Sequence, residues 1–290
     1  MICRSAGKPC CGGWMSAPDL LMREAAEEDL PALAEISRLT WEGDDYLADV
    51  ASGWIREGGF FVGVSDGEVA GCVRMAALPG PIIWLEGLRV HPGKRGRGYG
   101  RAMSEFVVSR ARRMLAEGLG RWVEFATYYR NSESIGITTA QGFSEVERFF
   151  VVSRGNASGM RGVAVRGFRR GWTGCYRMHV PCGWRLPIAC PDAEPWLEER
   201  CSAWDFDGAG FYGRKGRGEF ALLQSGMDRP SRASEGICRA ACRLGLTGGF
   251  DVILPESRPD VLEAFLAEGW SFWDEPAAPN LLVFRLSAGD

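Results

Sequence analysis

The stretch LRVHPGKRGRGYG, residues 88–100, decides the fold of this chain. An apolar segment, residues 82–90, leads into it and predicts a strand, and apolar residues recur at helical spacing after it. Arg95, Gly98 and Gly100 place a charge or no side chain at all where the connecting loop must bend tightly. Several backbone N–H groups of such a loop can point at one guest, with the positive end of the helix behind them. We therefore expect the loop to bind a phosphate group.

A glycine-rich turn between a strand and a helix can also serve the turn alone. Here the pattern RxxGxG at Arg95–Gly100 follows a strand that ends in Leu88-Arg89-Val90, with His91-Pro92 between them. This pattern resembles the acetyl-coenzyme A signature of the GNAT acetyltransferase superfamily. The resemblance implies acetyl-coenzyme A as co-substrate, its pyrophosphate held by main-chain N–H groups. It implies contacts to that co-substrate from Leu88, Arg89, Val90, Arg95, Gly96, Arg97, Gly98, Tyr99, Gly100, Arg101, Asn131 and Ser134.

The segments around the signature extend the resemblance. Asp29 and Pro31 indicate a helix start, and Asp66-Gly67 indicates a hairpin turn between two strands. The elements expected after the signature helix are a strand, a helix and a strand at residues 122–128, 131–141 and 143–152. The GNAT fold has these elements in the same order. We therefore predict a GNAT catalytic domain over residues 22–153, after a disordered leader at 1–21 in which Met15 or Met22 could be the true start.

The C-terminal half repeats the later part of this pattern. It predicts strands at 220–224, 252–254 and 281–286, helices at 231–244 and 259–268, and a further strand opening at Gly269-Trp270. No RxxGxG occurs there, and Arg214–Gly218 (RKGRG) precedes its strand, where it indicates a hairpin turn. We therefore predict a degenerate GNAT-like domain over 154–290 that no longer holds the cofactor, covers a sheet edge and lines the acceptor site. The fold class is α/β (α+β), with two tandem GNAT-like domains, each a mixed, mostly antiparallel sheet flanked by helices.

Acyl transfer to an amine needs an uncharged amine, because an ammonium group has no lone pair for attack. An α-amino group with a pKa near 8 is about one-tenth neutral at pH 7, whereas a lysine with a pKa near 10.4 is almost fully charged. Glu86, two residues before Leu88 on the same strand, is the candidate base for this proton. The alternative is that Glu86 lies on the solvent side or forms an ion pair with Arg89 or Arg74.

The leaving thiolate needs a proton. Many GNAT enzymes supply it from a tyrosine seven residues after the asparagine of the last helix, and this chain has Thr138 there. Tyr128 is the candidate general acid, Tyr129 is an alternative, and the thiolate could also leave unassisted. The resemblance also implies that backbone groups of Leu88 and Val90 align the acyl arm and polarise its carbonyl, a contact worth on the order of 3 kcal/mol.

A second resemblance concerns the acceptor. The segments Gly43–Leu47 and Trp84–Val90 are similar to a two-domain GNAT group that includes histidine N-acetyltransferase, whose members acetylate the α-amine of a free amino acid. It implies acceptor contacts from Asp45, with Asp44 as an alternative, and from Tyr46 and Glu86. Asp44 and Asp45 could instead cap a helix beside a packed tyrosine. Arg89 could bind an acceptor carboxylate, or pair with Glu86.

Composition narrows the function classes. The chain has 290 residues, 34 basic and 37 acidic, with a formal charge of -3, so no overall field recruits nucleic acid or an acidic membrane. No apolar run is long enough to span a bilayer. The two histidines lack thiol partners at ligand spacing, so no metal is expected, and the 10 cysteines contain no CxxC pair and predict no disulfides. A cytoplasmic location is expected.

Three functions fit these observations to different degrees. The first is an acetyl-coenzyme A-dependent N-acetyltransferase acting on a primary amine of a small molecule, such as an amino acid, or of a peptide. The second is a non-catalytic acyl-coenzyme A sensor or scaffold, which Thr138 and the degenerate repeat favour. The third, an RNA-binding RGRGYG segment, fits poorly because such segments are usually repeated and accompanied by a basic excess.

Overall fold

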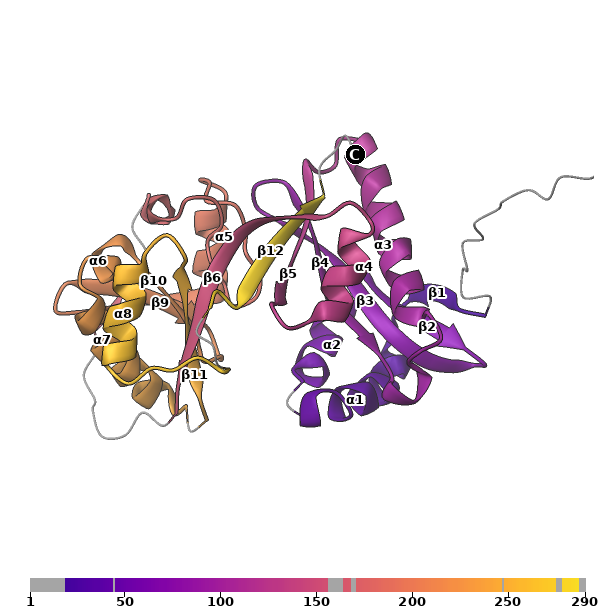
Figure 1. The fold of residues 1–290 in the computed structure, drawn as a ribbon, viewed down its shortest axis with the longest axis horizontal. Coiled ribbons are helices and arrows are strands. Elements are labelled where there is room, and N and C mark those ends of the chain that lie inside the picture. The colour runs from indigo at the N-terminus through magenta and orange to yellow at the C-terminus, as the bar shows by residue number, and fades with distance from the viewer. Residues whose placement is uncertain are drawn as a thin grey trace, which may run out of the picture. The chain divides into compact units, whose positions relative to one another are not determined.

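The computed structural model describes residues 19–43, 45–155, 164–167, 171–246, 248–274 and 278–286. Its internal contacts divide the chain into two compact units. Unit 1 comprises the chain up to Arg74 together with Gly87–Phe106, and unit 2 comprises Met75–Glu86 together with Val107–Asp290. The division cuts through three elements, labelled β3, β4 and α3 in Figure 1, so each of these contributes to both units.

Unit 1 contains three antiparallel strands and two helices that precede the signature. Its elements are β1 (Leu21–Glu24), α1 (Leu30–Arg38), α2 (Leu47–Glu57), β2 (Phe60–Ser65) and the first part of β3 (Glu68–Leu78), with short 3-10 helices at Glu27–Asp29, Trp41–Gly43 and Pro92–Lys94. The end of β4 (Ile82–Val90) and the start of α3 (Tyr99–Ala116) complete it. The predicted hairpin turn is confirmed, since Asp66 and Gly67 both have positive φ, 57° and 78°.

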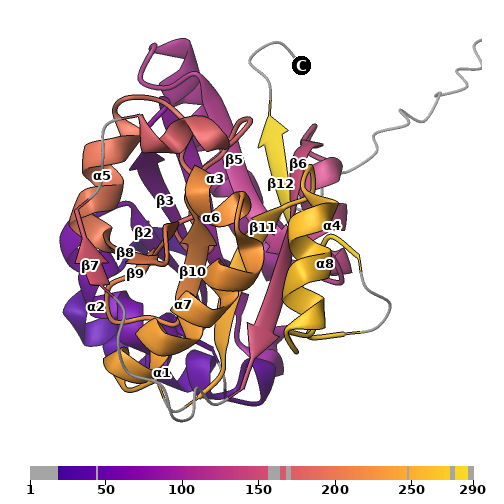
Figure 2. The ribbon, with the colours of Figure 1, turned by 90° about the vertical axis from the view of Figure 1, so that its left-hand side faces the viewer.

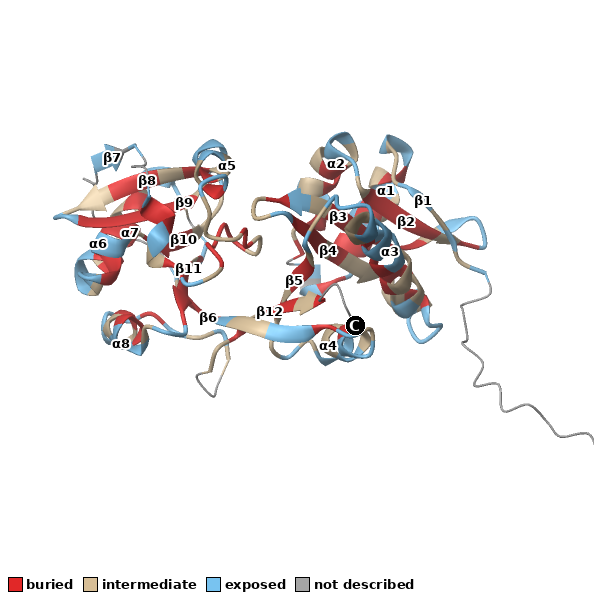
Figure 3. Cartoon of the chain, turned by 90° about the horizontal axis from the view of Figure 1, so that it is seen from above, coloured by how far each residue is buried: buried red, intermediate tan, exposed pale blue. Residues whose placement is uncertain are grey.

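The strand period of two explains how unit 1 packs on both faces of its strands. Phe60 and Val62 of β2 belong to a buried cluster with residues of α1 and α2. Phe61, between them, meets Phe106 of α3 edge-on, with ring centroids 5.2 Å apart. Figure 3 shows α1 and α2 on one side of these strands and α3 on the other. Gly71 of β3 lets α3 approach, because a Cβ there would lie 2.6 Å from Met103 Cε.

Unit 2 contains the remaining strands and helices. They are β5 (Trp122–Tyr128), α4 (Ser132–Thr139), β6 (Ser144–Arg154), β7 (Ala164–Arg166), α5 (Ala193–Arg200), β8 (Cys201–Phe206), β9 (Ala209–Arg214), β10 (Glu219–Leu222), α6 (Gln224–Met227), α7 (Pro230–Leu244), β11 (Phe250–Pro255), α8 (Pro259–Ala267) and β12 (Leu281–Leu286), with a 3-10 helix at Trp172–Cys175. The strand order is β4-β5-β12-β6-β11-β10-β9-β8-β7. Two pairs are parallel, β4 with β5 and β10 with β11, and each is joined by a helix, α3 or α7.

The last strands of the two sequence repeats are exchanged. By its position in the first copy β6 corresponds to β12 in the second, yet β12 pairs antiparallel with β5, from Leu281 opposite Tyr128 to Leu286 opposite Val123. In turn β6 pairs antiparallel with β11. Figure 2 shows β6 between β12 and β11, where it pairs with both. The predicted boundary near residue 153 therefore lies at the end of a strand shared by both copies, and the domain limits remain a prediction.

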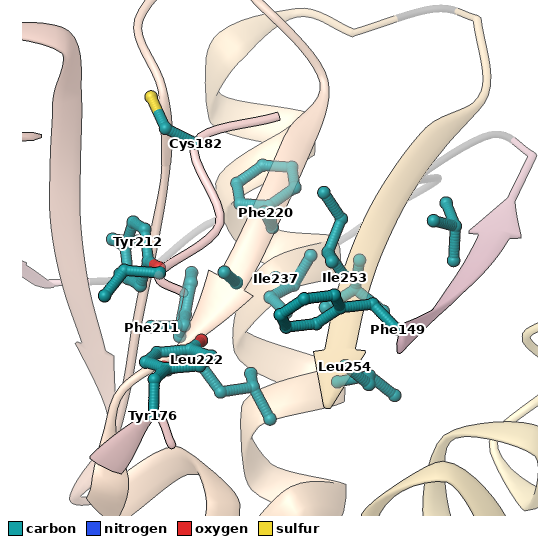
Figure 4. Packing of buried hydrophobic residues seen from close by; sticks show 14 of the residues in the cluster. Phe149, Tyr176, Cys182, Phe211, Tyr212, Phe220, Leu222, Ile237, Ile253 and Leu254 are labelled. Atoms are coloured by element: carbon teal, nitrogen blue, oxygen red, sulfur yellow. Dashed lines mark hydrogen bonds between the residues drawn. The ribbon is translucent and has the colours of Figure 1, made fainter. Parts of the chain in front are cut away.

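The core of unit 2 is rich in aromatic side chains. Phe211, Phe220 and Phe250 are each at most 1 % exposed and meet one another or Trp204 at ring distances near 6 Å. Figure 4 shows Phe211 and Phe220 of this cluster together with Ile237 of α7 and Ile253 of β11. Such burial contributes most of the stabilisation of a domain, so the second copy keeps a complete core.

Most expected elements are present, and one is not. Strands β4, β5 and β12 have the predicted bounds, and Arg214–Gly218 forms the predicted hairpin turn between β9 and β10. The strand expected to open at Gly269-Trp270 is wrong, because the described residues that follow form only a single bridge, Ser271 with Ser153. The leader at 1–21 lies mostly outside the described residues. No helix of the described part is both long and apolar enough to cross a membrane.

Candidate active site

The signature loop of unit 1 is open and shaped by two glycines. His91 closes its first turn, since its Nδ1 accepts a hydrogen bond from the Gly93 N–H at 3.1 Å. Gly96 and Gly98 both have left-handed backbone, with φ of 76° and 79°. A Cβ added to either would have no atom within 4 Å. The glycines are therefore required by backbone conformation, and the space beside them is empty of protein atoms.

The start of α3 offers its main-chain donors. Within the described residues, no acceptor bonds the N–H groups of Gly98, Tyr99, Gly100 and Arg101, whereas the Ala102 N–H already bonds the Gly98 carbonyl at 3.0 Å. Gly98 and Arg101 are exposed. Four donors with the positive end of an 18-residue helix behind them are the arrangement that favours a bound anion. That this loop binds a pyrophosphate remains a prediction.

The side chains of Tyr99 and Lys94 anchor this loop to β2 and β3. Tyr99 is buried, and its hydroxyl lies 2.7 Å from the hydroxyl of Ser65 on β2. Lys94 donates to the Ser65 carbonyl at 3.2 Å and pairs with Glu68 at 2.8 Å. Arg95 and Arg97 are exposed and form no ion pair with any described residue, so their charges remain for a phosphate. Arg101 pairs with Glu105 on the helix surface.

The corresponding loop of the second copy is closed. Between β10 and α7 it contains the short helix α6, and the N–H groups of Gly226, Met227 and Asp228 bond carbonyls within the loop at 2.9–3.0 Å. A Cβ at Gly226 would lie 2.1 Å from the Gly210 carbonyl oxygen. The donors of α6 are therefore used within the loop, and the space beside Gly226 is filled. This loop lies where the signature lies in the first copy, but it lacks the open glycine turn of the signature.

Strand β4 bends where the signature begins. Its pairing with β5 ends at Trp84 opposite Glu124. Gly87 then has φ of 71°, and a Cβ there would lie 2.5 Å from the Trp54 ring, so only glycine fits. The Leu88 carbonyl accepts a bond from the Arg89 guanidinium at 3.0 Å. The bend leads into Leu88–Val90, the segment predicted to contact the acyl arm.

Arg89 pairs with Asp45, not with Glu86 as one expectation had it. Its Nε and Nη2 contact the two Asp45 carboxylate oxygens at 3.1 and 3.0 Å, and the Asp45 side chain is fully buried. The guanidinium also lies over the ring of Trp41, 4.4 Å from its centroid, and 5.4 Å from that of Tyr46. Unit 1 thus brings the predicted acceptor residues Asp45 and Tyr46 together around one cation. Asp44 lies outside the described residues.

Glu86 belongs to an ion pair that the sequence did not predict. Arg185, from the second half of the chain, bonds both its carboxylate oxygens, with Nε to Oε2 at 2.9 Å and Nη2 to Oε1 at 2.7 Å. The Glu86 side chain is 10 % exposed and that of Arg185 is 18 % exposed. Arg74, an expected alternative partner, forms an ion pair with Glu57. Glu86 is therefore a held carboxylate rather than a surface charge.

The hydroxyls of Tyr128 and Thr138 are already engaged in hydrogen bonds, whereas the buried hydroxyl of Tyr129 has no hydrogen-bond partner among the described residues. The Tyr128 hydroxyl bonds the Asp274 carboxylate, and burial together with this bond raises the pKa of Tyr128. Thr138 donates its hydroxyl proton to the Ser134 carbonyl at 2.7 Å, within its own helix. Tyr129 stands edge-on to Tyr128, with centroids 5.0 Å apart. A general acid must give its proton to the thiolate, so Tyr128 can act only if its bond to Asp274 opens.

Asn131 and Ser134 lie in unit 2, at the start of α4. Asn131 caps this helix, because its Oδ1 accepts from the Ser134 N–H at 3.3 Å and its Nδ2 donates to Thr127 Oγ1 at 3.1 Å. Both residues therefore fix the helix start. Their predicted contact with the cofactor arm remains a prediction.

Sequence reasoning missed Arg185, Asp274 and Trp41. Trp41 gave a signal that could have been noted, because it adjoins the GDDYL segment, and the structure shows it 58 % exposed with φ of 46°. Arg185 and Asp274 lie in stretches without helical or strand periodicity, where no local pattern names a partner. Within the described residues, no group of three His, Cys, Asp or Glu side chains is arranged to hold a metal.

Comparison with known proteins gives one family match, to the first half of the chain. Residues 23–143 match the model of the acetyltransferase (GNAT) family. This match includes β4, the signature loop, α3, β5 and α4. The sequence matches none of the curated proteins with which it was compared.

Several solved structures share the fold over nearly the whole chain. A candidate acetyltransferase from Thermoplasma acidophilum is 18 % identical with a TM-score of 0.63, covering 92 % of this chain and 99 % of its own. One from Pyrococcus horikoshii is 15 % identical with a TM-score of 0.64, covering 93 % and 90 %. A GCN5-related N-acetyltransferase from Sphaerobacter thermophilus is 15 % identical with a TM-score of 0.59, covering 93 % and 96 %. At these identities the likeness concerns the fold, and it extends over both halves.

Proposed function

Since this chain carries a domain of the GNAT acetyltransferase family over residues 23–143, we propose that it transfers an acetyl group from acetyl-coenzyme A to a primary amine. The family implies acetyl transfer that depends on an acyl-coenzyme A. The finer part of the proposal is the acceptor, a small molecule such as an amino acid, or a peptide α-amine.

The open start of α3 is the observation that supports the proposal most directly. A diphosphate suits this loop: four N–H groups have no acceptor among the described residues, two glycines are left-handed, and the charges of Arg95 and Arg97 are exposed. The bound co-substrate supplies the acyl thioester. Main-chain groups of Leu88 and Val90 orient its carbonyl in this proposal, and the bend at Gly87 directs that part of the strand.

On the acceptor side, Glu86 takes the proton of the attacking amine. Arg185 bonds both Glu86 oxygens, and in this proposal the carboxylate accepts the amine proton directly or through a bridging water. Asp45 and Tyr46 contact the acceptor in this proposal, and the charge of Asp45 is shared with Arg89. An α-amine suits a site with one carboxylate base, since it loses its proton far more readily than a lysine.

A matched pair of glycine variants tests the cofactor site. Gly118 has φ of 73°, is exposed and has no neighbour within 4 Å of an added Cβ, so it reproduces the setting of Gly98 outside the loop. Alanine at either position costs about 1–2 kcal/mol of backbone strain. Acetyl-coenzyme A at a hundred times its dissociation constant stabilises the protein by about 2.7 kcal/mol. We expect this thermal shift in the wild type and Gly118→Ala and its loss in Gly98→Ala; no shift in the wild type contradicts the proposal.

Turnover separates the enzyme from a non-catalytic acyl-coenzyme A sensor, which Thr138 in the acid position favours. The assay measures free coenzyme A with a panel of amino acids, amines and N-terminal peptides. Cofactor binding without product from any acceptor supports the sensor. Tyr128→Phe tests the general acid: a loss of kcat of about 10²-fold supports that role, and unchanged kcat shows that the thiolate leaves without this phenol.

A further inference from the structure

A hairpin from the second half of the chain carries the partner of Glu86. Residues 178–189 fold back on themselves through hydrogen bonds from the Ala189 N–H to the Met178 carbonyl at 2.7 Å, and from the Val180 N–H to the Pro187 carbonyl at 2.9 Å. A further bond, Cys182 N–H to Arg185 carbonyl at 2.9 Å, closes the tip. We call residues 178–189 the arm. Arg185 is the last residue of its tip.

The base of the arm is fixed by buried charges. His179 is fully buried, with Nδ1 2.6 Å from Glu147 and Nε2 2.9 Å from Glu124. Glu124 also bonds Arg285 of β12. The Ile188 N–H donates to the Pro79 carbonyl at 3.2 Å. These contacts tie the arm to β5, β6, β12 and the turn before β4.

The tip of the arm is fixed as firmly as its base. Tyr212 is buried and donates its hydroxyl to the Pro181 carbonyl at 2.9 Å. Gly183 has φ of 59°, and a Cβ there would lie 2.9 Å from Arg214 and 3.0 Å from Glu219. These contacts fix the backbone conformation of the tip and, with it, the position of Arg185.

Arg185 meets Glu86 with the geometry that holds a carboxylate plane. Both contacts, 2.9 and 2.7 Å, come from Nε and Nη2 of one guanidinium edge, so the two groups are coplanar partners. A lysine at this position could balance the charge but not fix the plane. Glu86 is two residues from Leu88, where the proposed function places the reacting acyl group.

We propose that Arg185 is a positioning residue for the reaction: the arm of the second half delivers it to hold the Glu86 carboxylate in the orientation that accepts the amine proton. This inference rests on the proposed function. Rate enhancement by proton transfer depends on a base within hydrogen-bond reach of its proton. Without the two-point contact from Arg185, that contact no longer fixes the plane of the Glu86 carboxylate, so fewer encounters are productive. The second copy, whose own loop is closed, thereby contributes to the active site of the first.

A double-mutant cycle with Glu86 tests the proposal, because a residue that acts only through another loses its effect when that other is removed. Glu86→Gln should lower kcat about 10²-fold. Arg185→Ala should lower kcat to within about threefold of that value, and Arg185→Lys should lie between wild type and alanine. In the Glu86→Gln background neither Arg185 variant should slow turnover further. The KM for acetyl-coenzyme A and its thermal shift should stay unchanged throughout.

The control is Arg232→Ala, which removes a surface ion pair with Glu235 on α7 and should leave kcat unaltered. If the Arg185→Ala variant does not fold, the same double-mutant cycle is measured with Arg185→Lys. Equal slowing by an Arg185 variant in both backgrounds overturns the positioning role, because it shows an effect that does not pass through Glu86. Wild-type kcat in both Arg185 variants overturns it as well. A wild type that binds the cofactor but turns over no acceptor overturns the proposed function itself.

Discussion

Replacing His179 with leucine should destabilise unit 2 by about 3–5 kcal/mol. The imidazole is fully buried, and each ring nitrogen contacts a different carboxylate. Burial opposes its charge, but the hydrogen bonds to Glu124 and Glu147 outweigh this and raise the pKa of His179. With Arg285 bonded to Glu124, the cluster balances two negative charges with two positive ones. Leucine removes one positive charge and both ring donors.

The loss in free energy of unfolding depends on which partners Glu124 and Glu147 keep after the substitution. Glu124 has no exposed side-chain surface but retains Arg285. In the leucine variant, the one contact with the arm that Glu147 keeps is the hydrogen bond from the main-chain N–H of residue 179 at 2.9 Å. The Glu147 side chain is 15 % exposed. One largely buried negative charge is thus stranded. Breaking a buried pair in this way costs about 3–5 kcal/mol, and the partial exposure of Glu147 places the loss near the lower end.

Urea unfolding followed by tryptophan fluorescence measures this loss. We expect a lower midpoint with an unchanged slope, since the buried surface is the same. The double variant His179→Leu with Glu147→Gln should recover about half of the loss, because it removes the stranded charge. A loss below about 1 kcal/mol for His179→Leu, or no recovery in the double variant, refutes the charge-balance argument.

Three further predictions concern the same two units. Because the pKa of His179 is raised on folding, its contribution is complete below its unfolded pKa of about 6.5 and is lost as pH rises through the folded pKa; wild-type stability should fall with rising pH relative to His179→Leu in urea melts. Gly71→Ala places a Cβ 2.3 Å from the Arg89 carbonyl and should cost about 1–3 kcal/mol by the same assay. Tyr99→Phe removes the 2.7 Å hydrogen bond to the Ser65 hydroxyl, which keeps only a 3.4 Å contact to Asp66. This change should lower the free energy of unfolding by about 1 kcal/mol and weaken acetyl-coenzyme A binding in a thermal-shift titration.

The local pattern of the sequence predicted the elements that carry the signature because each is delimited by its own residues. Strand β4 is an apolar run that ends at His91-Pro92, and β5 ends at a turn before Asn131. The bend at Gly98 was predictable for the same reason, and its φ of 79° confirms it, whereas Gly100, also expected in the bend, lies in helix α3, and the second positive φ of the loop is at Gly96. These properties depend on neighbours in the chain.

Pairing between distant segments left no such local mark. A mostly apolar strand such as β12 has the same sequence pattern whether its partner is β6 alone or β5 and β6 together, so the exchange of final strands was not predictable. Arg185 lies 99 residues from Glu86 in a segment without periodicity, and the chain offers many arginines as partners. Sequence reasoning therefore identified Glu86 but proposed other partners for it.

The strand exchange explains how a copy with a closed cofactor loop can remain indispensable. Strand β5 has β4 on one side and β12 on the other, and β6 lies between β12 and β11. Removing the second half would expose the edge of β5 and deprive β6 of both its neighbours, and unpaired edges of this kind are prone to aggregate. The arm would be lost with it, leaving Glu86 without Arg185. The second half therefore contributes its strands and its arm, and neither contribution requires an anion site in its own loop.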